Sequence, residues 1–306
     1  MLGGIILKDK KLRRIGKGRF SGMDAYLWLA PCLILMIVFI LVPVLEVFHM
    51  AFSEISAANL LKKFGTLENF TYLFKQKAFG RVMINTAIWT VAIVGISIVL
   101  SIILALILNE KFKGRAFHRT VLILPWATSL LITSAAWKYI LNYDYGALNA
   151  LLLKLGFIEQ PINYLGDPVS AFIWMIIVGI VVTIPFMTFT LLSGLQSISD
   201  DFYEAAVIDG ANFWDKLFKI TLPLLRPSIN VTIVLNVIYV FNSFAIVNTI
   251  TEGAPANKTH TISTYLYYLA FRKNKYGASA ALSVVSFVIL TVFAVIYMRT
   301  QMKEED

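Results

Sequence analysis

Four polar side chains recur at helical spacing inside an apolar segment and could bind a ligand. They are three or four residues apart, which places them on one face of a helix: Thr232, Asn236, Tyr239 and Ser243. An asparagine amide both donates and accepts hydrogen bonds, and an aromatic ring can cover the apolar face of a pyranose. The stripe carries no fixed charge. It therefore suits an uncharged polar ligand such as a sugar.

An earlier apolar segment repeats this pattern. Thr183, Phe186 and Thr190 are spaced along it beside Pro185, whose missing N–H can open a helix locally. The polar and aromatic side chains of these two segments could line a substrate path. The alternative is that small hydroxyl residues only allow helices to pack closely and to hydrogen-bond across their interface in lipid.

Residues 199–227 are polar enough to lie outside a bilayer, yet they carry helix signals. Ser199 or Asp200 can cap a first helix, and Gly210 suits the left-handed residue that terminates one. A second helix is predicted to begin at Asn212 and to end at Pro223. Each helix is short enough to be marginal alone in water, so something must hold the pair.

The elements around these residues are predicted to be membrane helices. Of the 306 residues, 58% are hydrophobic and 15% are charged, and the mean hydropathy is +0.74. Runs of about twenty apolar residues are long enough to cross a hydrocarbon core of roughly 30 Å. We place six spans at about residues 26–48, 84–108, 120–141, 169–194, 228–250 and 278–298.

The net charge is +9, and the positions of the basic residues indicate which segments face the cytoplasm. Basic residues crowd the first 25 positions and the hinge at 111–119, as the positive-inside rule expects of cytoplasmic segments. Six spans then place both termini and the 199–227 loop in the cytoplasm. We divide the chain into a basic cytoplasmic tail (1–25), a first span with an external loop (26–83) and a five-helix core (84–300).

Several activities are disfavoured. The chain lacks a phosphate-binding loop, and spans two to six carry no Asp or Glu in their middles, unlike most ion-coupled carriers. His49, His118 and His260 are scattered near predicted membrane edges, where we expect solvated or interfacial side chains. Cys32 stands alone, and no basic domain with interleaved aromatic residues indicates nucleic-acid binding. We predict no enzyme site, no metal and no nucleic-acid partner.

The segments Glu204-Ala205-Ala206, Asp209-Gly210-Ala211 and Ile220-Thr221-Leu222-Pro223 resemble the EAA loop of ATP-binding-cassette (ABC) importer permeases, in the form found in MalF-like sugar permeases. Residues 115–149 and 193–198 resemble the same family, as does Thr251 to Pro255, where Glu252 replaces a usual glycine. The resemblance implies an all-α, six-helix permease of the type I, MetI-like importer fold. The residues that would couple to an ATPase are Glu204, Ala205, Ala206, Asp209 and Gly210. In MalF-like permeases, positions that match Thr183, Phe186, Asn236, Tyr239 and Ser243 line the sugar pocket, so the resemblance implies that these five residues line the substrate path.

The resemblance also implies partners. These are a second homologous permease, two ABC ATPase subunits, an extracellular or periplasmic solute-binding protein and a sugar, in the bilayer of a bacterial cytoplasmic (inner) membrane. ATP and Mg would bind to the partner ATPase, and this chain would bind no cofactor. Two alternatives stay open. An importer of another polar metabolite, such as glycerol phosphate, should place an Arg or Lys in its path, and a stand-alone carrier should transport without an ATPase.

Overall fold

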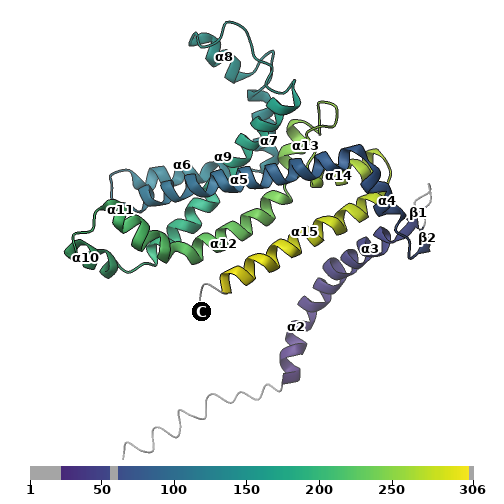
Figure 1. The fold of residues 1–306 in the computed structure, drawn as a ribbon, viewed down its shortest axis with the longest axis horizontal. Helices are drawn as coiled ribbons and strands as arrows, with labels where there is room; N and C mark the ends of the chain where they lie inside the picture. Colours follow the sequence, from purple (N-terminus) through teal and green to yellow (C-terminus); the bar gives the residue numbers. More distant parts are fainter. Residues whose placement is uncertain (1–21, 56–60, 303–306) are drawn as a thin grey trace, which may run out of the picture. The chain divides into compact units, whose positions relative to one another are not determined.

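The computed structural model describes residues 22–55 and 61–302, and nearly all of them are helical (Figure 1). The chain divides into two units, with the boundary after His49. The first unit contains α2 (Gly22–Met36), a π-helical turn η1 (Ile37–Leu41) and most of α3 (Val42–Ala51). Residues 28–51 of this run are long and apolar enough to cross a membrane, which agrees with the predicted first span.

The second unit begins with a short hairpin and an amphipathic helix. Strand β1 (Ser53–Ile55) pairs antiparallel with β2 (Leu61–Phe64), with Ser53 opposite Phe64. Helix α4 (Glu68–Lys75) follows. The Asn69 amide on α4 donates hydrogen bonds to the carbonyl groups of Met50, Ala51 and Ser53, at 3.3, 3.1 and 2.8 Å. These bonds hold α4 against the end of α3 and the first strand of the hairpin.

Two long parallel helices, α5 (Lys77–Asn109) and α9 (Pro168–Gln196), form the centre of this unit. Gly179 on α9 allows the close approach, because a β-carbon there would overlap the side chain of Ile93 on α5. The Trp89 indole N–H donates to the Val240 carbonyl oxygen at 2.9 Å, which joins α5 to α12 (Leu222–Phe241). The buried apolar core surrounds this contact and includes Trp89, Ile93, Val94, Met175, Val178, Val182, Met187 and Val240.

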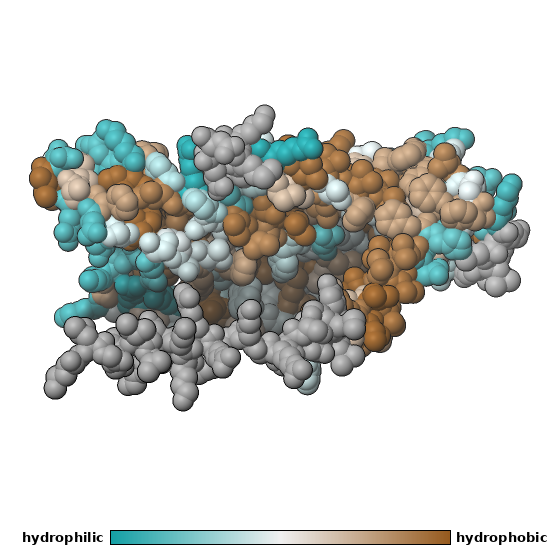
Figure 2. All heavy atoms as spheres, turned by 90° about the horizontal axis from the view of Figure 1, so that it is seen from below, coloured by the Kyte–Doolittle hydropathy of each residue, from teal (hydrophilic) through white to brown (hydrophobic). Residues whose placement is uncertain are grey.

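The last long helix, α15 (Tyr276–Met302), contacts α12, and the two lie side by side in Figure 1. Figure 2 shows broad apolar surface on one face, with hydrophilic residues at the left and right of the view and some between them. Over the described ranges, five helices are long and apolar enough to span, or six if one sharply bent pair counts as a span. Six spans were predicted.

The bent pair corrects the third span, which we expected as one helix over residues 120–141. Helices α6 (Arg115–Ala127) and α7 (Leu130–Ile140) meet at 93°. Pro125 removes a backbone donor from the last turn of α6, and the Thr128 hydroxyl donates to the Pro125 carbonyl oxygen at 3.0 Å. Thr128 itself is extended and ends the helix. The break therefore has a local cause in the sequence.

The connections contain shorter helices. After α7 comes α8 (Ala147–Lys154), and the loop after α9 holds α10 (Asp200–Ile208) and α11 (Phe213–Lys216). The fifth predicted span is interrupted, because α12 ends at Phe241 and α13 (Ala245–Ile250) starts after a short break. Between α13 and α15 are α14 (Ile262–Tyr267) and a further π-helical turn, η3 (Tyr268–Arg272).

The prediction that Pro223 ends a helix is wrong. A π-turn, η2 (Leu217–Thr221), follows α11 directly and continues into α12, which contains Pro223 in its first turn. In this turn the Leu222 N–H donates to the Leu217 carbonyl oxygen, five residues back. The wider π-helical turn allows the backbone to remain helical at Pro223, which has no N–H to donate. The amphipathic segment after Asn212 therefore leads without a stop into the fifth span.

Candidate functional site

The first helix of the 199–227 loop is capped as the sequence predicted. The Ser199 hydroxyl accepts a hydrogen bond from the Asp201 N–H at 3.3 Å, and the acidic first turn faces the positive end of α10. Gly210 has φ +77°, the left-handed conformation expected just after a helix. Both predicted boundaries of α10 are confirmed.

The five residues expected to couple to an ATPase lie on α10 and just after it. Glu204, Ala205, Asp209 and Gly210 are exposed, and Ala206 is buried. The Ala206 carbonyl oxygen accepts the Ala211 N–H at 2.9 Å, so the chain turns back over the end of α10. The loop therefore presents four of the five residues on its surface.

A capping box starts the second helix of the loop. The Asn212 side-chain oxygen accepts the N–H groups of Trp214 and Asp215 at 2.8 and 3.0 Å, and the Asp215 carboxylate accepts the Asn212 N–H at 3.3 Å. The hydroxyl groups of Tyr203 and Thr221 are 3.1 Å apart. This contact joins α10 to η2, so the two helices are held to each other and to the base of α12.

The loop carries a large apolar surface that the second unit leaves uncovered. Ile208 is 86% exposed, and the rings of Trp214 and Phe218 stack with centroids 6.0 Å apart. Exposed apolar clusters of this kind mark interaction surfaces. We call the set the loop patch; its members are Phe202, Val207, Ile208, Phe213, Trp214 and Phe218.

Two arginines join the helix ends that meet just before the 199–227 loop. Arg119 on α6 donates to the Leu108 carbonyl oxygen of α5 at 3.2 Å, and Arg115 donates to that of Asn109 at 3.4 Å. The Gln196 amide oxygen, oriented toward both arginines, accepts hydrogen bonds from the guanidinium groups of Arg115 and Arg119 at 3.2 and 3.0 Å. We call this contact the arginine clasp. It joins the ends of α5, α6 and α9 immediately before the loop begins.

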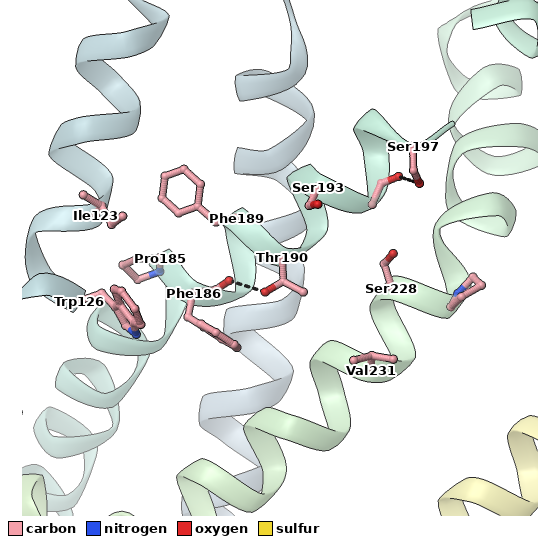
Figure 3. A pocket seen from close by; sticks show the side chains of 12 residues that line it. Ile123, Trp126, Pro185, Phe186, Phe189, Thr190, Ser193, Ser197, Ser228 and Val231 are labelled. Atoms are coloured by element: carbon pink, nitrogen blue, oxygen red, sulfur yellow. Dashed lines mark hydrogen bonds between the residues drawn. The ribbon is translucent and has the colours of Figure 1, made fainter. Parts of the chain in front are cut away.

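A cavity of about 740 Å³ lies between α6, α9 and α12 (Figure 3). The rings of Trp126 and Phe186 stack along one side, with centroids 6.2 Å apart. Hydroxyl groups come from α9 and α12, and none of the lining side chains is charged. The lining residues are Ile123, Trp126, Pro185, Phe186, Phe189, Thr190, Ser193, Gly194, Ser197, Pro227, Ser228 and Val231.

The structure brings two residues of the polar segments, Phe186 and Thr190, to this cavity and places the others elsewhere. Thr183 and Asn236 are buried, and they donate to the carbonyl oxygens of Gly179 and Thr232 within their own helices, at 2.7 and 2.8 Å. Ser243 is also buried, beyond the end of α12. Tyr239 is half exposed but does not line the cavity. Of the five expected path residues, only Phe186 therefore lines this cavity.

Sequence reasoning missed most of the other cavity residues, among them Trp126, Ser193 and Ser228. Each stands beside a residue that shapes a helix: Trp126 follows Pro125, Ser228 follows Pro227, and Ser193 precedes Gly194. A β-carbon at Gly194 would overlap the Ser228 side chain, so this glycine sets how closely α9 and α12 approach. A proline or glycine next to a polar or aromatic residue was the feature of the sequence that could have indicated these cavity residues.

His260 corrects another expectation, because it is buried rather than solvated at a membrane edge. The side chain is 3% exposed, and its Nδ1 lies 3.1 Å from the Thr264 hydroxyl. The rings of Tyr265 and Tyr268 lie against it, and a β-carbon at Gly253 would overlap the imidazole. Burial lowers the pKa of His260 to about 4. His118, by contrast, is exposed.

The fold and this site define a class: a helical membrane permease with a structured polar loop and an uncharged cavity. Residues 97–301 match the sequence profile of the family described as "Binding-protein-dependent transport system inner membrane component". The chain belongs to this family. Its members are permease subunits rather than enzymes, so the predicted non-catalytic role is confirmed.

Two relatives cover nearly the whole chain. A probable ABC transporter permease protein of Brucella abortus is 45% identical over 281 residues, which are 92% of this chain and 97% of that protein. The trehalose/maltose transport system permease protein MalF of Thermococcus litoralis is 35% identical over 274 residues, 90% of this chain and 92% of that one. These similarities confirm the family resemblance.

A solved structure confirms the fold. It is a bacterial ABC transporter involved in the import of the acidic polysaccharide alginate. One of its chains aligns with a TM-score of 0.80 at 24% identity, over 97% of this chain and 98% of that one. The predicted type I importer permease fold is therefore correct.

Proposed function

We propose that this chain is the permease subunit of an ATP-driven, binding-protein-dependent importer of a sugar. The observation that carries the substrate class is the uncharged cavity between α6, α9 and α12, in which stacked aromatic rings lie beside hydroxyl groups. Aromatic faces cover the apolar face of a sugar ring, and hydroxyl groups exchange hydrogen bonds with its own hydroxyls. The name of the Thermococcus relative, a trehalose/maltose permease, supports the same class.

The competing substrate, a glycerol phosphate or a similar anion, would need a cation in the path. No Arg or Lys lines the cavity. Tyr239, Asn236, Thr183 and Ser243 remain candidates for the part of the path that a second, homologous permease would complete. Tyr239 is the accessible member of this set, because half of its surface is exposed in the single chain.

We propose that α10 is the coupling helix that docks on a cytosolic ATPase subunit. Its support is the exposed position of Glu204 and the uncovered loop patch, which together offer a carboxylate and apolar contacts to a partner. The two ATPase subunits would bind ATP and Mg, and a binding protein would deliver sugar to the opposite side. Both termini would then be cytoplasmic, and the division into 1–25, 26–83 and 84–300 follows this topology.

The coupling assignment is tested with Glu204→Lys and Gly210→Asp in the assembled transporter. We expect uptake into proteoliposomes to fall by roughly tenfold or more, as for the loss of an interface hot spot, while the amount of protein in the membrane is unchanged. The matched control is Glu110→Lys, a charge reversal at the exposed end of α5. Full uptake by either loop variant would refute the assignment.

The cavity is tested with Phe186→Ala. Because one aromatic contact to the sugar is lost, the KM for uptake should rise about three- to tenfold with little change in assembly. Phe287→Ala removes an exposed ring from α15, away from the cavity, and should leave KM unchanged. Equal KM values in the two variants would remove Phe186 from the path.

A further inference from the structure

A second groove, of about 720 Å³, opens between the first turns of α5, the first turns of α9 and the loop before α14. The helices α5 and α9 run parallel, and the arginine clasp holds their C-terminal ends next to the 199–227 loop. The groove therefore lies at the end of the bundle opposite that loop. It is separate from the cavity between α6, α9 and α12, with which it shares no residue.

Three cations stand at the mouth of this groove. Lys77 and Arg81 are one turn apart on α5, and Lys258 comes from the loop between α13 and α14. All three are exposed, and within residues 22–55 and 61–302 none of them forms an ion pair with a carboxylate. Three like charges without a counter-ion repel one another, so an anion bound among them is favoured.

The position of Lys258 is fixed by hydrogen bonds. The Asn85 amide on α5 donates to the carbonyl oxygens of Lys258 and His260, at 2.8 and 3.0 Å. The loop is therefore held against α5 at the level of the groove. The nearest acidic residue in sequence, Asp167, caps α9, where its Oδ2 accepts the N–H groups of Val169 and Ser170. Among the described residues, Asp167 forms no ion pair with the three cations.

The floor of the groove is apolar and extends along the two helices. Ile84 and Ile88 of α5 face Val169, Ile173 and Ile176 of α9 across it. Ile88 lies eleven residues beyond Lys77, a rise of about 16 Å along a helix. Half of a bilayer's hydrocarbon core measures roughly 15 Å. The groove thus changes from charged to apolar over the depth of one lipid leaflet.

We propose that this groove binds an anionic phospholipid. The phosphate group lies among Lys77, Arg81 and Lys258, and one acyl chain lies along the isoleucines between α5 and α9. Cationic side chains attract an anionic head group, and long basic side chains reach the interface from helix ends. The inference depends on α5 and α9 crossing the membrane and does not depend on the identity of the transported substrate.

A lipid fits better than the other possible occupants. A soluble anion would use the three cations but would leave the isoleucine floor empty. An acidic protein surface would meet a narrow apolar slot between two spans, where its own polar groups would lose water without new partners. A phospholipid can place its anionic head group among the cations and an acyl chain on the isoleucine floor at the same time.

The test uses the full transporter assembly purified from membranes, with bound phospholipid quantified by mass spectrometry. Lys77→Gln/Arg81→Gln/Lys258→Gln removes the charge, and Ile173→Trp fills the apolar floor at a half-exposed position. The control, Lys75→Gln/Lys138→Gln/Lys154→Gln, removes three exposed lysines that do not line the groove. Each assembly is then titrated with phosphatidylglycerol, with phosphatidylcholine and with soluble glycerol phosphate.

We expect retained phosphatidylglycerol to fall about tenfold in both groove variants and to be unchanged in the control. Added phosphatidylglycerol, and neither phosphatidylcholine nor glycerol phosphate, should raise the melting temperature of the unmodified assembly. Equal phosphatidylglycerol in all assemblies would overturn the proposal. So would displacement of the lipid by glycerol phosphate alone, or weaker docking of the binding protein with lipid content unchanged.

Discussion

The buried position of the His260 imidazole depends on the absence of a side chain at Gly253. Gly253 has φ +88°, which L side chains rarely adopt, and the imidazole of His260 occupies the space beside its α-carbon. The Thr251 hydroxyl accepts the Gly253 N–H at 3.2 Å and lies 3.0 Å from the hydroxyl of Thr259. This buried turn precedes α14 and positions the loop that carries Lys258.

Gly253→Ala should therefore destabilise the protein. The new methyl group meets the imidazole, and alanine is strained at this φ, which together should cost about 1–3 kcal/mol. Gly80→Ala is the control, because its β-carbon meets nothing within 4 Å and its helix would accept alanine. Thermal unfolding in detergent gives the comparison. Equal melting temperatures would show that the turn can relax freely.

The buried imidazole also predicts a pH dependence. The pKa of His260 is about 4 in the folded protein and near 6.5 when exposed, so the unfolded chain binds the extra proton first. The contribution of neutral His260 to the free energy of unfolding is fully present above about pH 6.5. This contribution, of up to about 3 kcal/mol, is lost as the pH falls toward 4.

His260→Phe keeps a ring beside Gly253 and removes the titration. Its melting temperature should fall less between pH 7.5 and pH 5 than that of the unmodified protein. His118→Phe changes an exposed histidine and should retain the full pH dependence. If the two variants behaved alike, another group would have to carry the effect.

Single residues could be predicted from the sequence where their role is local. Ser199, Asn212 and Gly210 are caps and a turn, and each depends on a few neighbouring residues, so all three were read correctly. The burial of His260 depends on rings from α14 and η3 and on a turn seven residues earlier. No local pattern in the sequence indicates such packing.

At the scale of elements, the contact between α5 and α12 is built around Trp89. The side chain is fully buried, and its hydrogen bond to the Val240 carbonyl oxygen connects residues far apart in the sequence. Trp89→Phe should cost about 1–3 kcal/mol, because it removes that bond and leaves unfilled volume. Trp28→Phe, at a position 78% exposed, should change stability by no more than about 0.5 kcal/mol.

A loss of the same size in both tryptophan variants would contradict this account of the core. The measurement is the midpoint of thermal unfolding of the purified protein at constant lipid and detergent. A decrease confined to Trp89→Phe would show that the indole N–H and its packing hold α5 against α12.

The long helices were predictable because twenty apolar residues in a row suffice to indicate a span. Their interruptions were harder to predict. The 93° bend between α6 and α7 and the break after Phe241 have only weak local signals, and the π-turn before Pro223 reverses the usual interpretation of proline as a helix terminator. The bend follows Trp126, which lines the cavity, and the π-turn belongs to the 199–227 loop. Wrong boundaries for these two features therefore led to wrong expectations about the site.

At the scale of the whole molecule, the chain offers two surfaces that a single subunit leaves unused. The loop patch is exposed beside Glu204, and the cavity with Phe186 is open between α6, α9 and α12. The path residues expected from sequence did not gather in one space, because helical spacing shows which residues share a face but not what that face meets. We expect a second permease to complete the path.

The most direct measurement is the ATPase rate of the assembly that copurifies with the tagged chain, recorded with a binding protein and a panel of sugars. The account predicts that a second permease and an ATPase copurify, and that one sugar-loaded binding protein stimulates hydrolysis. It also predicts that Glu204→Lys abolishes this stimulation. A chain that purifies alone and transports without an ATPase would contradict the account.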